Sequence, residues 1–218
     1  MEFLERTNML INTNSLKNKT IAVFGLGGVG CYVVEGLVRA GISSFILVDY
    51  DVISKTNINR HLLAFNETIG FKKTVLQKER ILKIQPKAKI QIYDLMWNQE
   101  TANQIDFTKI DFIVDAIDMV SSKILLIQLA KEKNIPIISC MGTGNRLNPF
   151  LFEITDISKT SVCPLAKTMR YELKKRNIHH VPVLYSKEVP SRHILTNEFG
   201  KHIPGSISFV PAVAGMCI

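Results

Sequence analysis

The sequence is poor in cysteine and has no long apolar run. Its four cysteines, Cys31, Cys140, Cys163 and Cys217, lie far apart, and no two of them have CxxC spacing. Neither a zinc site nor a disulfide framework is therefore indicated. No stretch approaches the roughly 18 apolar residues of a membrane span, and the first twenty residues lack the apolar core of a signal peptide. We therefore expect a reduced, cytoplasmic protein without membrane contact.

The chain does have enough apolar residues for one full core and an excess of positive charge. It has 218 residues, of which 46% are hydrophobic, and a formal net charge of +8. Residues 159–202 contain nine Lys or Arg against three acids, a net +6. A local basic surface suits a polyanion such as RNA. A solvated helix face with a loop would give the same composition, and charge alone leaves both interpretations open.

Strand and helix patterns alternate along residues 1–144. Strands are expected at 20–24, 44–48, 88–93, 112–116 and 135–140, and helices at 31–40, 72–83 and 123–133. This alternation predicts the α/β class and a Rossmann-like doubly wound sheet that is mainly parallel in this half, with ligands at the carboxyl ends of the strands.

The pattern changes after Gly144. Half-exposed strands are expected at 151–154 and 181–186, with a helix that begins near Pro164 between them. We expect an antiparallel half of the same sheet, followed by a long mobile loop at about 187–206. The chain then forms a single domain, 1–218, with a nucleotide-binding half, 1–144, and a substrate-binding half, 145–218.

A glycine fingerprint follows the first strand and opens the first long helix. Its glycines are Gly25, Gly27, Gly28 and Gly30, and Asp49 lies 19 residues beyond the last of them. Such glycines let the backbone approach phosphates at a helix N-terminus, while the acid accepts hydrogen bonds from a ribose hydroxyl. The fingerprint alone does not distinguish NAD from ATP.

Further motifs favour ATP, because a nicotinamide enzyme has no use for them. They are Asp49-x-Asp51, Thr56-Asn57-Ile58-Asn59-Arg60, Lys73 after Gly70, and Asp115-Ala116-Ile117-Asp118. Over essentially its whole length the sequence resembles the E1-like adenylating superfamily of ThiF and MoeB, whose motifs occur in this order. The resemblance implies ATP and Mg²⁺ as cofactors.

The resemblance also implies roles for single residues. Asp49 holds the ribose, Asn57 and Arg60 contact the triphosphate, Lys73 binds phosphate, and Asp118 helps to hold Mg²⁺; Asp51 and Asp115 belong to the same cofactor-binding set. Arg60, Lys73 and Asp118 are the predicted catalytic residues, because cations must offset the triphosphate before a nucleophile approaches. Arg6 matches an arginine that reaches into the partner's ATP site, which implies a homodimer.

Taken singly, these residues have other interpretations. Arg60 and Lys73 can be ordinary surface cations, and Asp115 and Asp118 can cap a helix. The sequence also departs from the family pattern, since Phe71 stands where many relatives have a lysine and His61 replaces a glutamine. His61 can contact the nucleotide or simply be packed.

A closer resemblance is to the tRNA threonylcarbamoyladenosine dehydratases. It rests on residues 142–149, 156–160 with 164–166, and 185–188. It implies that ATP activates the threonyl carboxylate of N6-threonylcarbamoyladenosine at position 37 of tRNA, which then cyclises. Lys159 and Arg170 are expected to meet tRNA phosphates, and Lys167, Arg170 and Lys174 recur at helical spacing.

Two alternatives remain open at this point. One is a ThiF/MoeB-type adenylyltransferase that activates the C-terminus of a ubiquitin-like sulfur carrier, although the paired CxxC zinc motifs of such proteins are absent. The other is a nucleotide-binding scaffold without turnover. Cys163 can be a nucleophile or a small buried residue. The sequence identifies no sulfur-transfer or redox partner, and a chain that ends at Ile218 looks short at its C-terminus.

Overall fold

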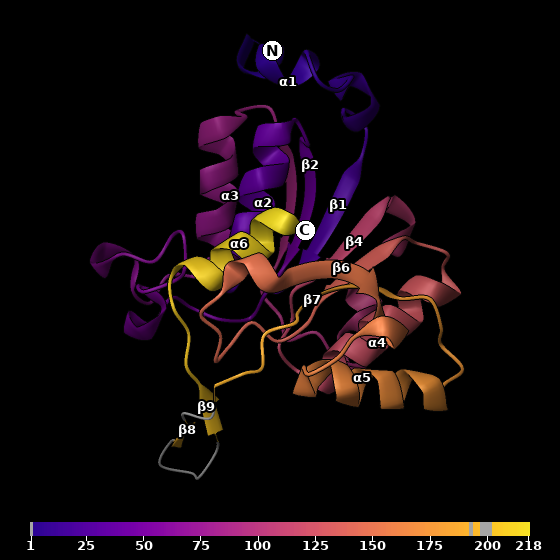
Figure 1. Ribbon diagram of the computed structural model, residues 1–218. Helices are drawn as coiled ribbons and strands as arrows, with labels where there is room; N and C mark the ends of the chain where they lie inside the picture. Colours follow the sequence, from indigo (N-terminus) through magenta and orange to yellow (C-terminus); the bar gives the residue numbers. More distant parts are fainter. Residues whose placement is uncertain (1, 192–193, 197–201) are drawn as a thin grey trace.

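A computed structural model describes residues 2–191, 194–196 and 202–218. Its centre is a seven-stranded sheet with the strand order β3-β2-β1-β4-β5-β7-β6 (Figure 1). The strands are β1 (Thr20–Phe24), β2 (Ser44–Val48), β3 (Lys89–Tyr93), β4 (Phe112–Asp115), β5 (Ile137–Cys140), β6 (Phe152–Asp156) and β7 (Pro182–Ser186). The α-helices are α1 (Glu5–Asn8), α2 (Gly30–Ala40), α3 (Lys73–Ile84), α4 (Val120–Glu132), α5 (Pro164–Lys175) and α6 (Phe209–Cys217). Among the described residues, no helix has the length and apolar character that crossing a membrane requires.

The predicted α/β class and mainly parallel doubly wound sheet are confirmed. The expectation for the C-terminal half was too broad, however, because β7 runs parallel to β5 and only β6 is antiparallel to its neighbour. The physical reason is the connection between β6 and β7. β6 ends at the side of the sheet where the parallel strands begin. The chain then crosses to the side where they end, and α5 returns it, so that β7 starts alongside the beginnings of the parallel strands. Antiparallel pairing is therefore confined to one edge of the sheet.

Alternate residues of the central strands face two separate cores. Ala22 and Phe24 of β1 pack in the core covered by α4 and α5, whereas Ile21 and Val23 pack in the core covered by α2 and α3. Both sides of the strand are therefore apolar, as expected for a parallel sheet covered on both faces. Phe24 also contacts Trp97, with ring centroids 4.9 Å apart, which anchors the segment that follows β3.

The segment predicted as a mobile loop at 187–206 contains a two-stranded hairpin. Its strands are β8 (Ile194–Thr196) and β9 (His202–Pro204), which pair antiparallel; residues 192–193 and 197–201 of this segment lie outside the described residues. Both ends of the segment are held by Asn145, whose carbonyl accepts from the Ser191 N–H at 2.7 Å and whose N–H donates to the Gly205 carbonyl at 2.8 Å. The segment is thereby joined to the loop after β5.

The contact between α2 and α6 contains a glycine from each helix, and the two glycines differ in the space around them. A Cβ on Gly215 would lie 2.5 Å from the Val29 carbonyl oxygen, whereas a Cβ on Gly36 would lie 3.4 Å from the sulfur of Met216.

We therefore predict opposite effects of alanine at these two sites. Gly215→Ala lowers the free energy of unfolding, because the backbone clash outweighs alanine's helix advantage of about 1 kcal/mol. Gly36→Ala leaves it unchanged or raises it by up to about 1 kcal/mol. Urea unfolding of the two variants measures the difference, and equal effects would contradict this account of the contact.

Candidate nucleotide-binding site

A cavity of about 530 Å³ opens at the carboxyl ends of β1, β2, β4 and β5. Its position is the one that a doubly wound sheet favours for ligands. Nine of the twelve predicted site residues line it: Gly25, Gly27, Gly28, Asp49, Asp51, Asn57, Arg60, Lys73 and Asp118. Gly30, Asp115 and Arg6 are predicted site residues that do not line the cavity.

The glycine turn packs directly on the loop that follows β4. Gly25 has φ of +87°, and a Cβ there would lie 2.6 Å from the Ala116 carbonyl oxygen. A Cβ on Gly30 would lie 1.9 Å from the Gly25 carbonyl oxygen, so this glycine closes the turn from outside the cavity. Gly27 faces open space. The turn can therefore bring backbone amides against a phosphate at the start of α2.

Asp49 ties the glycine turn to the end of β2. One carboxylate oxygen accepts the Leu26 N–H at 2.6 Å and the other accepts the Asp51 N–H at 2.8 Å. Burial raises the pKa of the Asp49 carboxyl, and Lys73 and these two backbone N–H groups oppose that shift. Each oxygen keeps a lone pair for a further donor. Asp49 can therefore hold the turn and accept a hydroxyl of a ligand at once.

Two cations border the cavity and are held in different ways. The Lys73 ammonium is buried and lies 2.6 Å from Asp51. Arg60 donates from Nη1 to the Thr56 carbonyl at 2.8 Å and to the Asn59 side chain at 2.9 Å. Its side chain also lies against the glycine turn, since a Cβ added to Gly28 would be 3.2 Å from the Arg60 Cγ. The remaining guanidinium donors are those that an anion in the cavity can use.

Asn57 and His61 shape the loop that carries Arg60. The Asn57 side chain accepts the Ser54 N–H at 3.2 Å. His61 uses both ring nitrogens for the backbone: Nδ1 accepts the Leu63 N–H at 3.1 Å, so Nε2 donates to the Leu26 carbonyl at 2.7 Å. Burial lowers the pKa of His61 to about 4. His61 is thus packed and neutral, although part of it also lines the cavity.

The two acids of the Asp115-Ala116-Ile117-Asp118 motif occupy different environments. Asp115 is fully buried beneath the cavity, where it pairs with the fully buried Lys123 at 2.9 Å and accepts from the Ser139 hydroxyl at 2.5 Å. Lys123 also donates to the Ile117 carbonyl at 2.9 Å. Asp118 is exposed at the cavity wall and has no hydrogen-bond or salt-bridge partner within the described ranges. Asp115 therefore supports the loop that presents Asp118.

Arg6 lies at the opposite end of the sheet from the cavity (Figure 1). Leu4, two residues before it, packs against Gly41 at the end of α2, where β2 begins. A strand of five residues separates that edge from the carboxyl edge by roughly 16 Å. Arg6 consequently cannot reach the cavity of its own chain.

Part of the cavity wall was not predicted from the sequence. Leu95, Met96 and Trp97 line it after the end of β3, and Ser122 lines it from α4. The position of 95–97 just beyond a strand's carboxyl end was the available signal. Gly142, Thr143 and Gly144 also line the cavity, together with residues 204–206. The cavity therefore joins the two halves of the chain.

The cysteines near the cavity lie in the core. Cys163 is 2% exposed, and Cys140 is also buried, with burial raising the pKa of its thiol to about 12. A nucleophile must be accessible and able to form a thiolate. The geometry thus supports the interpretation of Cys163 as a small buried residue.

The strand order, the glycine turn and the cationic loop define a nucleotide-binding α/β protein of the E1-like type. The family model described as "ThiF family" matches residues 7–217, and the chain belongs to this family. It is 39% identical over 214 residues to the tRNA threonylcarbamoyladenosine dehydratase of Bacillus subtilis, and this alignment covers 93% of this chain and 84% of that protein.

Two further proteins resemble the chain. The Haemophilus influenzae tRNA threonylcarbamoyladenosine dehydratase is 41% identical over 162 residues, 73% of this chain and 61% of that protein. The crystal structure of the Escherichia coli tRNA N6-threonylcarbamoyladenosine dehydratase TcdA in complex with ATP superposes with a TM-score of 0.88 at 27% identity. It covers 98% of this chain and 89% of that one.

We predict that the buried Asp115–Lys123 pair is essential for stability. Lys123→Met leaves a buried carboxylate without its cation and lowers the free energy of unfolding by about 3–5 kcal/mol. Asp115→Asn combined with Lys123→Met restores part of that loss, because no buried charge remains. Chemical denaturation measures both variants. A double variant no more stable than Lys123→Met alone would show that the pair does not act as a unit.

Proposed function

We propose that this protein is an ATP-dependent tRNA threonylcarbamoyladenosine dehydratase. The observation that carries the proposal is a single cavity lined both by Gly25, Gly27, Gly28, Arg60 and Lys73, which suit phosphates, and by the dehydratase-like segment 142–144. The 1–144 half then binds the nucleotide and the 145–218 half recognises the tRNA. A tRNA substrate also implies that the enzyme acts in the cytoplasm.

The proposed reaction has two steps. The threonyl carboxylate of the modified adenosine attacks the α-phosphate of ATP, which forms a mixed anhydride with AMP and releases pyrophosphate. A carbamoyl heteroatom of the same modification then attacks the activated carbonyl carbon, loses its proton and expels AMP. The net result is the loss of one water from the modification at the expense of ATP. This ring closure requires no protein nucleophile, in agreement with the buried Cys163.

The chain's own residues supply positioning and charge. Arg60 and Lys73 lie where they can offset the negative charge of the triphosphate as pyrophosphate leaves. Lys73 is fixed by Asp51, and Arg60 by the carbonyl of Thr56. Asp49 accepts a ribose hydroxyl. Because these groups are held in place before the nucleotide arrives, little reorganisation opposes the reaction.

Mg²⁺ suits the acids at the cavity. No group of three or more His, Cys, Asp or Glu in the described part of the chain can hold a metal ion by itself. Mg²⁺ with a nucleotide, however, usually takes one or two carboxylates and the phosphates. Asp118 is exposed at the wall without a protein partner in the described part, and it is the residue that would hold the ion. When bound, Mg²⁺ adds positive charge at the phosphates.

The second candidate function is activation of a ubiquitin-like sulfur carrier. The same glycine turn, Arg60 and Lys73 would serve it, since both reactions adenylate a carboxylate. The similarity of residues 7–217 to the ThiF family is its support. The two functions differ in the substrate that triggers pyrophosphate release, which makes that release the decisive measurement.

We predict that pyrophosphate release requires tRNA bearing threonylcarbamoyladenosine and is lost in Arg60→Ala. Arg60 is half-buried in a loop and does not belong to the apolar core, so we expect the variant to keep its fold, which circular dichroism checks. Retention of more than about a tenth of the activity, a difference of only about 1.4 kcal/mol, would contradict the role of Arg60. Release that depends on a carrier protein and not on tRNA would overturn the proposed function.

We further propose that the protein acts as a homodimer with Arg6 in trans. Arg6 is exposed, lies at the far edge of the sheet and makes no salt bridge among the described residues. Its neighbours Met9 and Leu10 expose more than four fifths of their surface. This exposed apolar segment is a candidate contact with a second copy, which would bring Arg6 to that copy's cavity.

Mixing two inactive variants tests this arrangement. Arg6→Ala and Arg60→Ala are each predicted to be inactive alone. In a mixed dimer, the Arg6→Ala subunit keeps Arg60 in its cavity and receives Arg6 from its partner, so one site of the two is complete. After subunit exchange we expect about a quarter of wild-type activity, because half of the dimers are mixed. If Arg6 acted within its own chain, mixing would restore nothing.

A further inference from the structure

The exposed side of α5 carries a continuous stripe of cations around one aromatic ring. The stripe consists of Lys167, Tyr171, Lys174 and Lys175, which are all exposed. Tyr171 lies four residues after Lys167, and Lys174 and Lys175 lie three and four residues after Tyr171, so each lies one turn from the ring. The opposite side of the helix, Ala166, Met169 and Leu173, is buried in the core. The stripe therefore faces solvent along the whole helix.

Arg170 does not belong to this stripe, contrary to the expectation from helical spacing. Its Nη1 donates to the Thr160 carbonyl at 3.0 Å and also to the Thr160 hydroxyl. Arg170 thus fastens α5 to the segment after β6. A phosphate contact by this residue would have to break those bonds.

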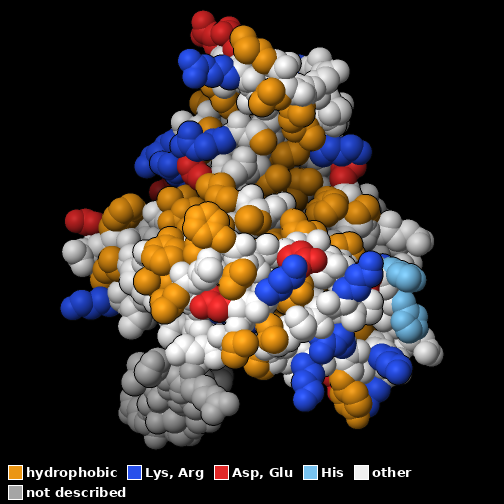
Figure 2. Space-filling model, viewed as in Figure 1, with side chains coloured by type: hydrophobic (Ala, Val, Ile, Leu, Met, Phe, Trp, Pro, Cys, Tyr) orange, Lys and Arg blue, Asp and Glu red, His pale blue; other side chains and the backbone are white. Residues whose placement is uncertain are grey.

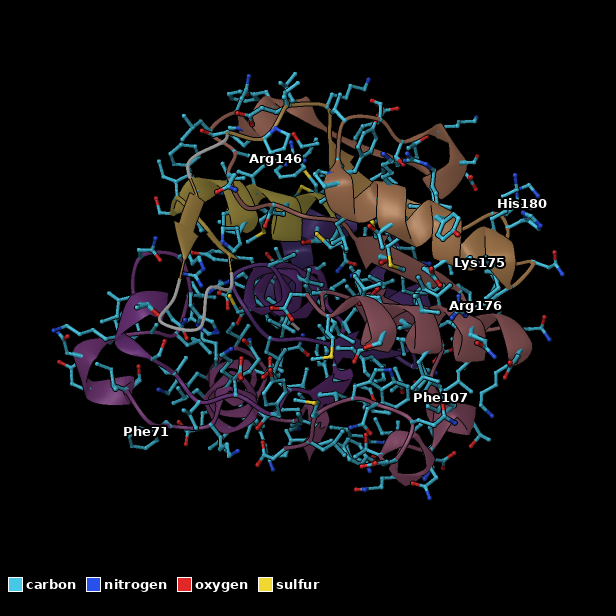
Figure 3. All side chains as sticks on the ribbon, turned by 90° about the horizontal axis from the view of Figure 1, so that it is seen from below. Phe71, Phe107, Arg146, Lys175, Arg176 and His180 are labelled. Atoms are coloured by element: carbon cyan, nitrogen blue, oxygen red, sulfur yellow. The ribbon has the colours of Figure 1, made fainter. Side chains whose placement is uncertain are left out.

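Further cations extend the stripe beyond the end of α5. Figure 2 shows Lys and Arg side chains gathered over α5 with His side chains beside them. Figure 3 labels Lys175, Arg176 and His180 at the same end of the helix. Lys131 of α4 donates to the His180 carbonyl at 2.8 Å, which holds the loop 176–181 against α4. The side chain of His180 is 94% exposed.

Few acids neutralise this charge. Glu172 is shared between Lys175, at 3.5 Å, and Arg176, at 2.7 Å. Asp156 lies 3.9 Å from His180, and Glu132 is bonded to Gln128. Within the described residues, Lys167 and Lys174 have no salt bridge. The region keeps an excess of positive charge.

Stabilisation of the helix end explains only part of this arrangement. Cations in the last turn of a helix interact favourably with its dipole, which accounts for Lys174 and Lys175. Lys167 lies in the first turn, at the positive end of the dipole, where a cation gains nothing from it. Tyr171 is 61% exposed with the Lys175 ammonium 4.1 Å from its ring centroid. An exposed ring among cations suits stacking with a nucleic-acid base.

The stripe starts at the cavity. Leu165 lines the cavity, and a Cβ on Gly142 of the cavity wall would lie 3.8 Å from the Cβ of Leu165. From there the 12 residues of α5 extend about 18 Å away from the cavity. Along the axis of a double helix, that length spans about five phosphates of one strand at roughly 3.4 Å each. A nucleic acid with one base in the cavity can therefore follow α5 with its backbone.

We propose that the α5 stripe is the docking surface for the RNA backbone of the substrate, with Tyr171 stacking on an unpaired base. This inference rests on the proposed function and specifies which surface holds the tRNA while the modified base enters the cavity. Binding through phosphates releases counterions, so affinity for tRNA depends on this stripe and on salt.

The test is the charge-reversal variant Lys167→Glu/Lys174→Glu/Lys175→Glu. Its control is Lys83→Glu/Lys87→Glu/Lys89→Glu, which makes the same charge change at exposed positions near the opposite edge of the sheet. We expect the stripe variant to bind tRNA more than tenfold more weakly at about 0.1 M salt. The slope of the logarithm of its tRNA binding constant against the logarithm of the salt concentration should become shallower by about two units. The KM for tRNA should rise, while kcat at saturating tRNA and protection by ATP stay unchanged.

A second pair of variants separates stacking from charge. Tyr171→Ala should weaken tRNA binding at least about fivefold with the salt slope unchanged, whereas Tyr171→Phe keeps wild-type affinity. Equal tRNA affinity and slope in the stripe variant and the wild type would overturn the inference, as would an equal loss in the control. The proposed function would survive both results. It would fail separately if the wild-type protein showed no tRNA-dependent pyrophosphate release.

Discussion

The contact between the glycine turn and the loop after β4 is the constraint on which the site depends. The Gly25 backbone approaches Ala116 so closely that any side chain would collide with the Ala116 carbonyl, which lies 2.6 Å from the position of a Cβ. This approach sets the distance between two cavity walls, one formed by the amides of the turn and the other by the loop that carries Asp118. The shape of the proposed phosphate site therefore follows from packing within the chain.

Two polar networks hold this contact from either side. Asp49 fixes the turn from the end of β2 by accepting the Leu26 N–H. Beneath the cavity, Asp115 and Lys123 fix the following loop, because Lys123 bonds to both Asp115 and the Ile117 carbonyl. Each network contains a buried charge. Because burying a charge costs free energy, the stability of the fold depends strongly on the groups that pair with it. Because these networks hold the backbone of the site in place, a small number of charged side chains is sufficient to contact the ligand.

Two separate groups of cations bear on the proposed function. Arg60 and Lys73 are held at the cavity by carbonyls and by Asp51, so their role is local. The cations of the α5 stripe point into solvent along a helix that starts at the cavity and extends about 18 Å away from it, so only an extended polyanion can reach both groups. The distribution suits a substrate that presents a small reacting group at the end of an extended charged backbone.

The sequence by itself determined the parallel part of the sheet in residues 1–144, the glycine turn and the position of Asp49, because apolar periodicity and the spacing from strand to acid are local properties of the chain. Most of the site residues that it predicted, nine of twelve, also lie at the cavity, because their motifs follow strand ends. Only the tertiary structure decided where the remaining side chains point. It placed Asp115 beneath the cavity with Lys123, turned Arg170 towards Thr160, brought Trp97 to the wall and put Arg6 at the far edge of the sheet. These outcomes depend on contacts between segments that are distant in the sequence. Helical spacing gives the face of a helix, but it does not say which neighbouring acceptor will capture a side chain.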